Sequence, residues 1–269
     1  MKIAITGESG LVGSRIIELL KNDFNFVPLK HSEFDIANSG QVTEYLDTLD
    51  FDLLLHLAAY TNVDKSEIEK NEAFSVNVIG TKNVFEAVSK KNKKMIYFST
   101  DFVFDGVNPP FDEESIPNPI GFYGQSKYEG ELFLKNKAMI ARISNPYGNS
   151  PAQKPDFVKK LALMLKKGRT LSMVTDSLMT PTHIDDIAYS IKHLINHFSP
   201  ETYHIVGSRS YSPFEIGRMI AEKNNISKKL ILPTSFKEYS QGKAPRPQYS
   251  KIVSTKNNFH KMKSFEDFM

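Results

Sequence analysis

Short apolar runs alternate with amphipathic stretches through the first half of this 269-residue chain, and this alternation constrains its fold more than any other feature. The runs are rich in β-branched and aromatic residues and lie at residues 3–6, 24–29, 53–59, 95–100 and 139–143. Helical patterns begin between them, near Leu11, Ser39, Asn71 and Phe122. Strands that alternate with helices of this length form βαβ units, whose strands are parallel and buried on both faces. The sequence therefore predicts an α/β fold with a doubly wound, Rossmann-like parallel sheet.

The regular alternation ends after Ser144, where several prolines follow one another before helical patterns at about residues 156–167 and 185–196. From residue 200 onward the chain is irregular and rich in proline. We therefore expect a Rossmann core of residues 1–145 plus about 179–199, and a smaller, irregular C-terminal substrate lobe of about 146–178 plus 200–269. Ligands of open α/β sheets bind at the carboxyl ends of the strands, so this lobe should close over that edge.

The composition excludes several classes of protein. With 40% hydrophobic and 24% charged residues, the chain is typical of folded soluble proteins. Its net charge of +3 is too small and too dispersed for nucleic-acid binding, although it suits an anionic ligand. There is no cysteine, and His183, Asp185 and Asp186 resemble helix-capping residues, so we expect no metal site. No leader or bilayer-length apolar segment is evident, which predicts a cytoplasmic protein without a membrane partner.

Three glycines follow the first expected strand and open the first expected helix, in the segment Gly7-Glu8-Ser9-Gly10-Leu11-Val12-Gly13. Glycine lets the chain turn sharply and approach a pyrophosphate, while the helix N-terminus offers free N–H groups to the phosphates. We expect a dinucleotide here, bound by Gly7, Ser9, Gly10, Leu11 and Val12; a tight strand-helix turn without a ligand is the alternative. The GxxGxxG spacing resembles that of short-chain dehydrogenases of the extended type.

The end of the second expected strand bears on the choice of cofactor. NAD-preferring sites usually place Asp or Glu there to bind the ribose hydroxyls, whereas this chain has Leu29, Lys30 and His31. A cation can bind a 2′-phosphate, so Lys30 favours NADP(H) over NAD(H), with a solvated lysine at the strand end as the alternative. Asp35 and Ile36 fit the position beside the adenine ring in the extended family, or else belong to a helix-capping cluster.

A YxxxK motif, Tyr123-Gly124-Gln125-Ser126-Lys127, opens another expected helix, and its spacing puts both side chains on one face. An ammonium beside a phenol lowers the tyrosine pKa, so the pair could deliver a proton to a carbonyl oxygen. Thr100 ends the expected fourth strand, where its hydroxyl could hold the substrate or satisfy only local backbone. Asn77, in the helical pattern before that strand, either hydrogen-bonds backbone near the site or is an ordinary polar helix residue.

Further motifs accompany these and run through nearly the whole chain. They are residues 58–67 (Ala-Ala-Tyr-Thr-Asn-Val-Asp-Lys-Ser-Glu), residues 99–106 (Ser-Thr-Asp-Phe-Val-Phe-Asp-Gly), Glu129-Gly130-Glu131, Pro181-Thr182, and Arg246-Pro247 followed by Ser250. In this order the motifs resemble those of dTDP-4-dehydrorhamnose reductases. The segment at residues 99–106 is the most specific part of the resemblance.

The resemblance implies NAD(P)H-dependent reduction of a nucleotide-linked 4-keto-6-deoxy sugar, catalysed by Thr100, Tyr123 and Lys127. It also implies a set of binding contacts. The residues beside the cofactor would be Ala58, Ala59, Tyr60, Tyr123 and Lys127, and those that meet the sugar would be Thr100 and Asp101. Arg246 would bind the diphosphate of the nucleotide sugar, because a guanidinium matches phosphate oxygens bidentately, or would form a surface salt bridge. Extended members commonly dimerise, so a homodimer is implied.

The chain departs from the reductases after the fifth expected strand. Where they typically carry Arg-Thr-Ser-Trp, it has Arg142-Ile143-Ser144-Asn145-Pro146-Tyr147-Gly148, so Asn145 stands in place of an aromatic wall at the sugar. This segment looks more like nucleotide-sugar epimerases, which leaves a 4-epimerase open as an alternative. Phe102 occupies the position where 4,6-dehydratases have a Glu, which argues against dehydration.

A second alternative comes from another class of function. The chain also resembles the regulatory β subunit of methionine adenosyltransferase, in which the same fold binds a partner instead of catalysing a reaction. Pro181-Thr182-His183 followed by Asp186-Ile187-Ala188 is compatible with either family. Only under this alternative would methionine adenosyltransferase be a partner.

Overall fold

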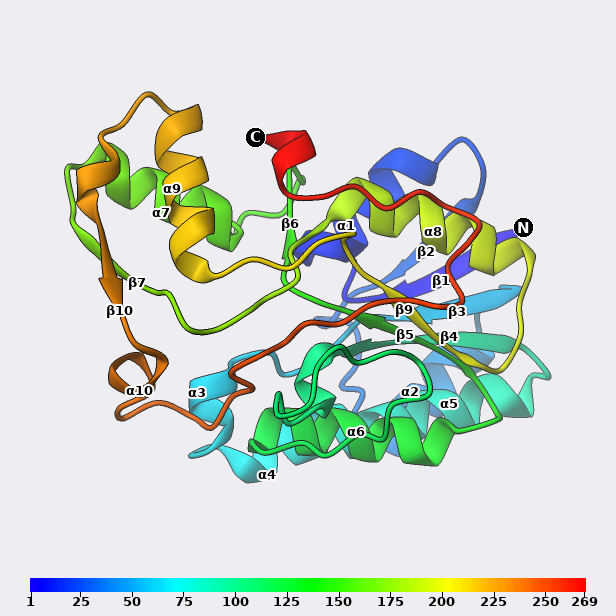
Figure 1. The fold of residues 1–269 in the computed structure, drawn as a ribbon. Coiled ribbons are helices and arrows are strands. Elements are labelled where there is room, and N and C mark those ends of the chain that lie inside the picture. The colour runs from blue at the N-terminus through cyan, green and yellow to red at the C-terminus, as the bar shows by residue number, and fades with distance from the viewer.

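The apolar runs of the first half become parallel strands of one central sheet, which lies between two layers of helices (Figure 1). The computed structural model describes residues 1–269. The strand order is β2-β1-β3-β4-β5-β9. The bounds are β1 (Lys2–Thr6), β2 (Asn25–Leu29), β3 (Leu53–His56), β4 (Lys94–Thr100), β5 (Met139–Ile143) and β9 (Thr202–Ile205).

The order of the strands creates a crevice at one edge of the sheet. After β1 the chain first adds β2 on one side, then crosses to add β3 and the following strands on the other. Thr6 pairs with both Leu29 and His56, so these three strands end at the same level. The helices that leave β1 and β3 therefore lie on opposite faces, which opens a site for a ligand between the strand ends.

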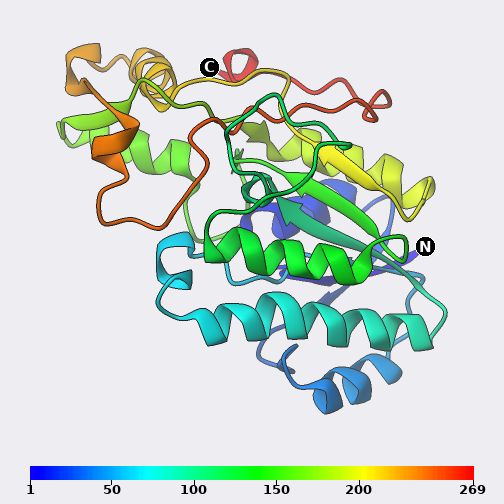
Figure 2. The same cartoon turned by 60° about the horizontal axis from the view of Figure 1, so that its bottom comes forward.

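Helices cover both faces of the sheet, as Figures 1 and 2 show. On one face lie α1 (Leu11–Leu20) and α8 (Ile184–Asn196); on the other lie α2 (Ser39–Asp47), α5 (Thr81–Lys90) and α6 (Phe122–Leu134). Alternate strand residues point to opposite faces. Ile3 and Ile5 accordingly face α8, whereas Ala4 joins the core beneath α2 and α5.

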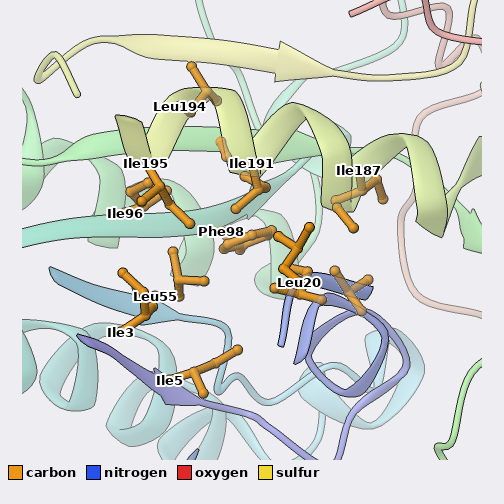
Figure 3. Close-up of a cluster of buried hydrophobic side chains, with 14 of the residues drawn as sticks. Ile3, Ile5, Leu20, Leu55, Ile96, Phe98, Ile187, Ile191, Leu194 and Ile195 are labelled. Atoms are coloured by element: carbon orange, nitrogen blue, oxygen red, sulfur yellow. The ribbon is translucent and has the colours of Figure 1, made fainter. Parts of the chain in front are cut away.

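The core beneath α8 is made almost entirely of aliphatic side chains (Figure 3). Ile187 and Ile191, one helical turn apart, belong to the same cluster as Leu55, Ile96 and Phe98 of the sheet, and all five side chains are buried. Burying one such side chain contributes on the order of 1.5–3 kcal/mol. This packing fixes the strand ends that carry the candidate site.

The connection between β3 and β4 is more broken than the sequence pattern predicts. In place of one helix beginning near Asn71 it contains α3 (Val63–Ser66), α4 (Lys70–Phe74) and a π-helical segment, η1 (Ser75–Gly80), which runs into α5. A π-helical turn is wider than an α-helical one and often occurs at functional sites. Here it carries Asn77 into the protein interior, where its side chain is fully buried.

A smaller group of elements lies beyond the carboxyl edge of the sheet (Figure 1). It contains α7 (Phe157–Lys166), α9 (Pro213–Lys223), α10 (Phe236–Tyr239) and the parallel pair β7 (Leu171–Val174) and β10 (Ile231–Thr234). Its own core includes Leu165, Ile216 and Phe265. The parallel pair β6 (Pro146–Tyr147) and β8 (Thr182–His183) connects it to the sheet, and three short 3₁₀ turns complete the elements: η2 (Asp101–Val103), η3 (Lys228–Leu230) and η4 (Glu266–Phe268).

One part of the chain beyond residue 200 lies elsewhere than expected. β9 pairs with β5 as the edge strand of the central sheet, although we expected residues 200–269 in the smaller lobe. Its sequence, Thr-Tyr-His-Ile, is only half apolar, because an edge strand needs less apolar surface than a central one. No helix of the structure combines the length and the apolar character needed to cross a membrane.

Candidate active site

A cavity of about 560 Å³ lies at the carboxyl edge of the sheet, between the central strands and the loop that follows β6. It is lined by residues that come directly after β1, by the ends of β4 and β5, and by the start of α6. Most of the site residues expected from sequence therefore meet in one place: Gly7, Ser9, Gly10, Leu11, Val12, Ala59, Thr100, Asp101, Tyr123, Lys127 and Asn145.

The glycine turn forms one wall of this cavity. The Gly10 N–H closes the turn by donating to the Gly7 carbonyl oxygen at 3.1 Å, and the N–H groups of the first turn of α1 have no partner within the helix. Gly7 has a φ of +69°, which side chains rarely allow, and a Cβ on Gly13 would collide with the Gly7 carbonyl oxygen. Gly10 is the N-cap of α1, has no side chain to cap the helix, and is followed by a first turn without acidic residues. Free N–H donors, a helix N-terminus and close backbone access fit the pyrophosphate of a dinucleotide.

The segment after β3 is held by a buried hydroxyl-imidazole pair. The Thr6 hydroxyl oxygen accepts the N–H groups of Leu57 and Ala58, each at 3.1 Å, so its own hydrogen goes to His56 Nδ1 at 2.8 Å. His56 Nε2 then donates to Thr81 at 3.2 Å. Complete burial lowers the pKa of His56 to about 3, so the ring is neutral. Sequence reasoning missed this pair, although a histidine in an otherwise apolar strand was its visible sign.

Asn77 holds the next residues of that segment. Its side-chain oxygen accepts from the Tyr60 N–H at 2.8 Å, and its amide group donates to the Tyr60 carbonyl at 3.2 Å and to Ser126 at 2.9 Å. The first of the two roles considered for Asn77 is therefore confirmed. Tyr60 itself points its hydroxyl at Glu69, and neither it nor Ala58 lines the cavity. Of the three residues expected beside the cofactor here, the structure places Ala59 at the cavity.

Lys127 is buried and firmly positioned. Its Nζ donates to the carbonyl oxygen of Phe98 at 2.8 Å and lies 4.1 Å from the centre of the Tyr97 ring. Burial lowers the pKa of Lys127 to about 7, an effect that the nearby Glu131 carboxylate partly offsets. The ammonium has three hydrogens, so two remain for a ligand once Phe98 has taken one.

Tyr123 behaves differently from the sequence-based prediction. We expected Lys127 to lower its pKa, yet burial raises the pKa of Tyr123 to about 12; the charge of Asp101 adds to this, and the Thr100 hydroxyl opposes it. The Lys127 ammonium is directed at the Phe98 carbonyl and makes no hydrogen bond to the phenol. The phenol ring and the Phe102 ring pack edge to face, with ring centres 5.6 Å apart. A phenol with this pKa stays protonated at neutral pH and can act as a proton donor.

Asp101 is the centre of a buried hydrogen-bond network next to Thr100. Its carboxylate accepts from the hydroxyls of Thr100 at 3.2 Å and Ser144 at 2.9 Å, and from the Ser250 hydroxyl of the C-terminal segment. Burial raises the pKa of Asp101, while these three hydrogen bonds act in the opposite direction. Asn145 extends the network, because its amide donates to the Ser144 hydroxyl at 2.9 Å. Asp101 lines the cavity, but its oxygens are already engaged.

Three residues expected around the adenosine part of the cofactor do not line the cavity. Lys30, at the end of β2, is 62% exposed and lies 3.7 Å from the Glu33 carboxylate. Asp35 accepts the Ala37 N–H at 2.9 Å, and Ile36 is buried against Gly80. Asn38, not Asp35, caps α2. Asp35 therefore forms a local turn just ahead of the helix cap.

Arg246 also lies outside the cavity lining. It forms an ion pair with Asp64, and its Nε donates to the Ala244 carbonyl at 3.1 Å. The salt bridge considered as the alternative for Arg246 is the arrangement observed. His183 and Asp185 likewise have structural contacts: His183 Nδ1 accepts the Asp185 N–H at 3.3 Å, and the Asp185 carboxylate pairs with Arg15 at 2.7 Å.

The loop after β6 supplies cavity residues that sequence reasoning missed, among them Ala152, Lys154, Pro155 and Asp156. Asp156 has a clear structural role, because its carboxylate accepts the N–H groups of Gly148 at 3.2 Å and Lys159 at 2.9 Å and so caps α7. Lys154 makes no hydrogen bond or ion pair. Nothing in the sequence marks it, since a loop has no periodicity from which the direction of a side chain can be deduced.

Comparison with known proteins gives one family across the whole chain. The model of the RmlD substrate binding domain matches residues 1–268. A dTDP-4-dehydrorhamnose reductase of Aggregatibacter actinomycetemcomitans is 36% identical over 70% of this chain, and the match spans 65% of that protein's length. Methionine adenosyltransferase 2 subunit beta of Bos taurus is 27% identical over 91% of this chain and 78% of its own length.

Solved structures agree with this result. The crystal structure of dTDP-4-dehydrorhamnose reductase from Bacillus anthracis in complex with NADP is 36% identical, has a TM-score of 0.91, and covers 99% of this chain and 96% of its own. A dTDP-glucose 4,6-dehydratase from Streptomyces venezuelae has a TM-score of 0.83 at 20% identity, with 99% of this chain and 94% of its own covered, and shares the fold.

Proposed function

The chain belongs to the RmlD substrate binding domain family, and from this membership we propose that it reduces the C4 ketone of a nucleotide-linked 4-keto-6-deoxy sugar with a nicotinamide dinucleotide. One observation carries the proposal: a single cavity contains the glycine turn, Thr100, Tyr123 and the buried Lys127. Relatives named as dTDP-4-dehydrorhamnose reductases, one of them solved with NADP, support the same reaction.

The bound nicotinamide supplies the hydride, and the residues of the chain supply the proton and the geometry. Tyr123 gives its phenolic proton to the ketone oxygen as negative charge develops there. Its pKa of about 12 keeps that proton available in the resting protein. The Thr100 hydroxyl oxygen accepts the Phe102 N–H at 3.2 Å, which holds it in place, while its hydrogen makes a long bond of 3.2 Å to Asp101 and can turn towards the ketone.

Lys127 and Asp101 support these groups. We propose that Lys127 uses its two free hydrogens to hold the nicotinamide ribose and to stabilise the phenolate that remains after proton transfer. Asp101 is a positioning residue, because it holds Thr100 and Ser144 at the ends of the two neighbouring strands β4 and β5. Asn145 lines the cavity, and we propose that it meets the sugar where the reductases typically have an aromatic wall.

The acidic residues of the cavity favour reduction over dehydration. Dehydration needs a carboxyl group free to exchange a proton with the substrate. The two carboxylates that line the cavity are Asp101, bound to three hydroxyls, and Asp156, bound to two backbone N–H groups. The residue after Asp101 is Phe102, whose ring packs against Tyr123.

We propose NADPH as the preferred form of the cofactor, because Lys30 places an exposed cation at the end of β2, beside the strand that leads into the glycine turn. Its contact with Glu33 is long, at 3.7 Å, and is easily exchanged for a phosphate. We also propose that the smaller lobe, together with residues 145–156, closes over the nucleotide sugar.

A spectrophotometric assay tests the proposed function directly. The purified protein is mixed with NADPH or NADH and with dTDP-, UDP- and GDP-linked 4-keto-6-deoxy sugars, and dinucleotide oxidation is followed. We expect oxidation with at least one sugar, and a higher kcat/KM with NADPH than with NADH.

Two outcomes would contradict the proposal. Retention of bound nicotinamide without net consumption, together with inversion at C4, would indicate a 4-epimerase. Failure with every sugar, combined with tight dinucleotide binding and capture of methionine adenosyltransferase, would favour the regulatory function suggested by the Bos taurus relative.

A further inference from the structure

Two cationic side chains, Lys127 and Lys154, line the candidate active site, and they differ in their hydrogen bonds to the rest of the protein. The Lys127 ammonium is fixed by the Phe98 carbonyl at 2.8 Å. Lys154 is exposed and makes no hydrogen bond or ion pair, and the neighbouring acid, Asp156, is occupied by backbone N–H groups. Arg246, the other cation expected at a diphosphate, is paired with Asp64 outside the cavity lining. Lys154 is therefore the cation that remains free for an anionic ligand.

The loop that carries Lys154 is attached to the first helix. The Ser150 hydroxyl lies 2.7 Å from that of Ser14, in the second turn of α1. Ser14 already donates its hydrogen to the Gly10 carbonyl at 2.7 Å, so Ser150 must be the donor in the contact between the two hydroxyls. This bond joins residues 136 positions apart and holds the loop against the helix that begins at the glycine turn.

The rest of the loop is fixed as well. The Ala152 N–H donates to the Ser150 hydroxyl oxygen at 3.1 Å, which orients the short segment leading to Lys154. On the far side, the Asp156 carboxylate holds the Gly148 N–H at 3.2 Å and the start of α7. The loop of residues 148–156, part of which lines the cavity, is thus held by hydrogen bonds near both ends and carries an unpaired ammonium group between them.

We propose that Lys154 binds the pyrophosphate of the dinucleotide from the side opposite the glycine turn, and that the Ser150–Ser14 bond positions it for this contact. The inference rests on the proposed function only in requiring a dinucleotide at the glycine turn. A helix N-terminus supplies about half a positive charge, whereas a pyrophosphate carries two negative charges, so a nearby cation adds to the attraction. The loop is bonded to α1, the helix that begins at the glycine turn. We therefore assign Lys154 to the diphosphate of the dinucleotide and not to the diphosphate of the nucleotide sugar.

The test is direct binding to the purified protein without substrate. The dissociation constant of NADPH is measured by its fluorescence for the parent, K154Q, S150A and the control K160Q, which removes an exposed lysine of α7 outside the cavity lining. We expect K154Q to bind NADPH roughly fivefold to tenfold more weakly, the loss of one charged hydrogen bond at an exposed site. S150A should weaken NADPH binding by a smaller factor, and K160Q should bind NADPH as tightly as the parent. The loss in K154Q should shrink at high salt.

The same proteins are titrated with dTDP to separate the two possible diphosphates. The assignment would be wrong if K154Q bound NADPH with the affinity of the parent, whether or not its binding of dTDP became weaker. Either result would leave the proposed reductase activity unaffected. If the parent itself bound neither NADPH nor NADH, the proposed function would fail together with this inference. Unfolding temperatures of all variants show whether any change in binding reflects loss of the fold.

Discussion

Burial moves the pKa values of Tyr123 and Lys127 in opposite directions and favours the uncharged form of each. The pKa of the phenol rises to about 12, and that of the ammonium group falls to about 7. The YxxxK spacing shows that the two side chains share a helix face, but it does not reveal their surroundings. The Phe98 carbonyl that binds Lys127 belongs to a strand 29 positions away, so this contact follows only from the three-dimensional structure.

Asp101 offers a test of the network that positions Thr100. Changing Asp101 to Asn replaces one accepting oxygen by a donating NH₂ group, so at least one of three buried hydroxyl donors loses its partner. We expect D101N to lower the free energy of unfolding by about 1–3 kcal/mol and to lower kcat more than dinucleotide affinity. Urea denaturation and steady-state kinetics measure these effects, with S144A as a milder variant. A fully stable D101N with parental kcat would show that the network has no positioning role.

The glycine turn is the element whose sequence most clearly predicts where a dinucleotide binds. A Cβ on Gly13 would overlap the Gly7 carbonyl oxygen, so α1 could not begin where it does. We expect G13A to weaken NADPH binding by about tenfold or more and to destabilise the protein. G40A is the matched control, because a Cβ there meets only the Asn38 side chain, at 3.4 Å, on the exposed start of α2. Equal NADPH affinities for the two variants would contradict the role given to the turn.

Elements with strong periodicity could be predicted from the sequence closely. β5 has the expected bounds, and β4 begins one residue before its expected start. β3 is shorter than expected, because the chain leaves the sheet at Leu57, where the N–H groups of Leu57 and Ala58 donate to the Thr6 hydroxyl. β9 and η1 were missed for related reasons. The short edge strand β9 forms because it pairs with β5, which is distant in sequence. The π-helical turn η1 is associated with the buried hydrogen bonds of Asn77, which also join distant residues.

At the scale of the whole molecule, the C-terminal segment ties the lobe and the core together. Ser250 donates to Asp101 at the candidate active site, and Asp186 of α8 accepts the Lys263 N–H at 3.0 Å and a bond from His260 at 3.1 Å. These contacts join residues 74 to 149 positions apart. No local pattern could have predicted them, because they depend on how the chain returns across the sheet.

The buried Lys127 makes stability depend on pH in a defined direction. Its pKa is about 7 in the folded protein and 10.5 when unperturbed, so between these values the unfolded chain holds a proton that the folded protein lacks. Raising the pH from 7 to 9 therefore stabilises the folded state, by up to about 1.4 kcal/mol per pH unit, whereas below pH 7 the penalty is constant. We expect the unfolding free energy of the parent, relative to K127M, to rise over this range in protein free of dinucleotide. A constant difference would show that Lys127 stays charged.

The most direct measurement of the central claim compares catalysis and cofactor binding in Y123F. The phenylalanine keeps the ring against Phe102 and removes only the hydroxyl group that is proposed to protonate the ketone. With the ketosugar accepted by the parent, we predict a fall in kcat by about 10² or more and a nearly unchanged dissociation constant for NADPH. Reduction of the ketosugar by Y123F at the parental rate would contradict the assignment of Tyr123 as proton donor and, with it, the proposed mechanism.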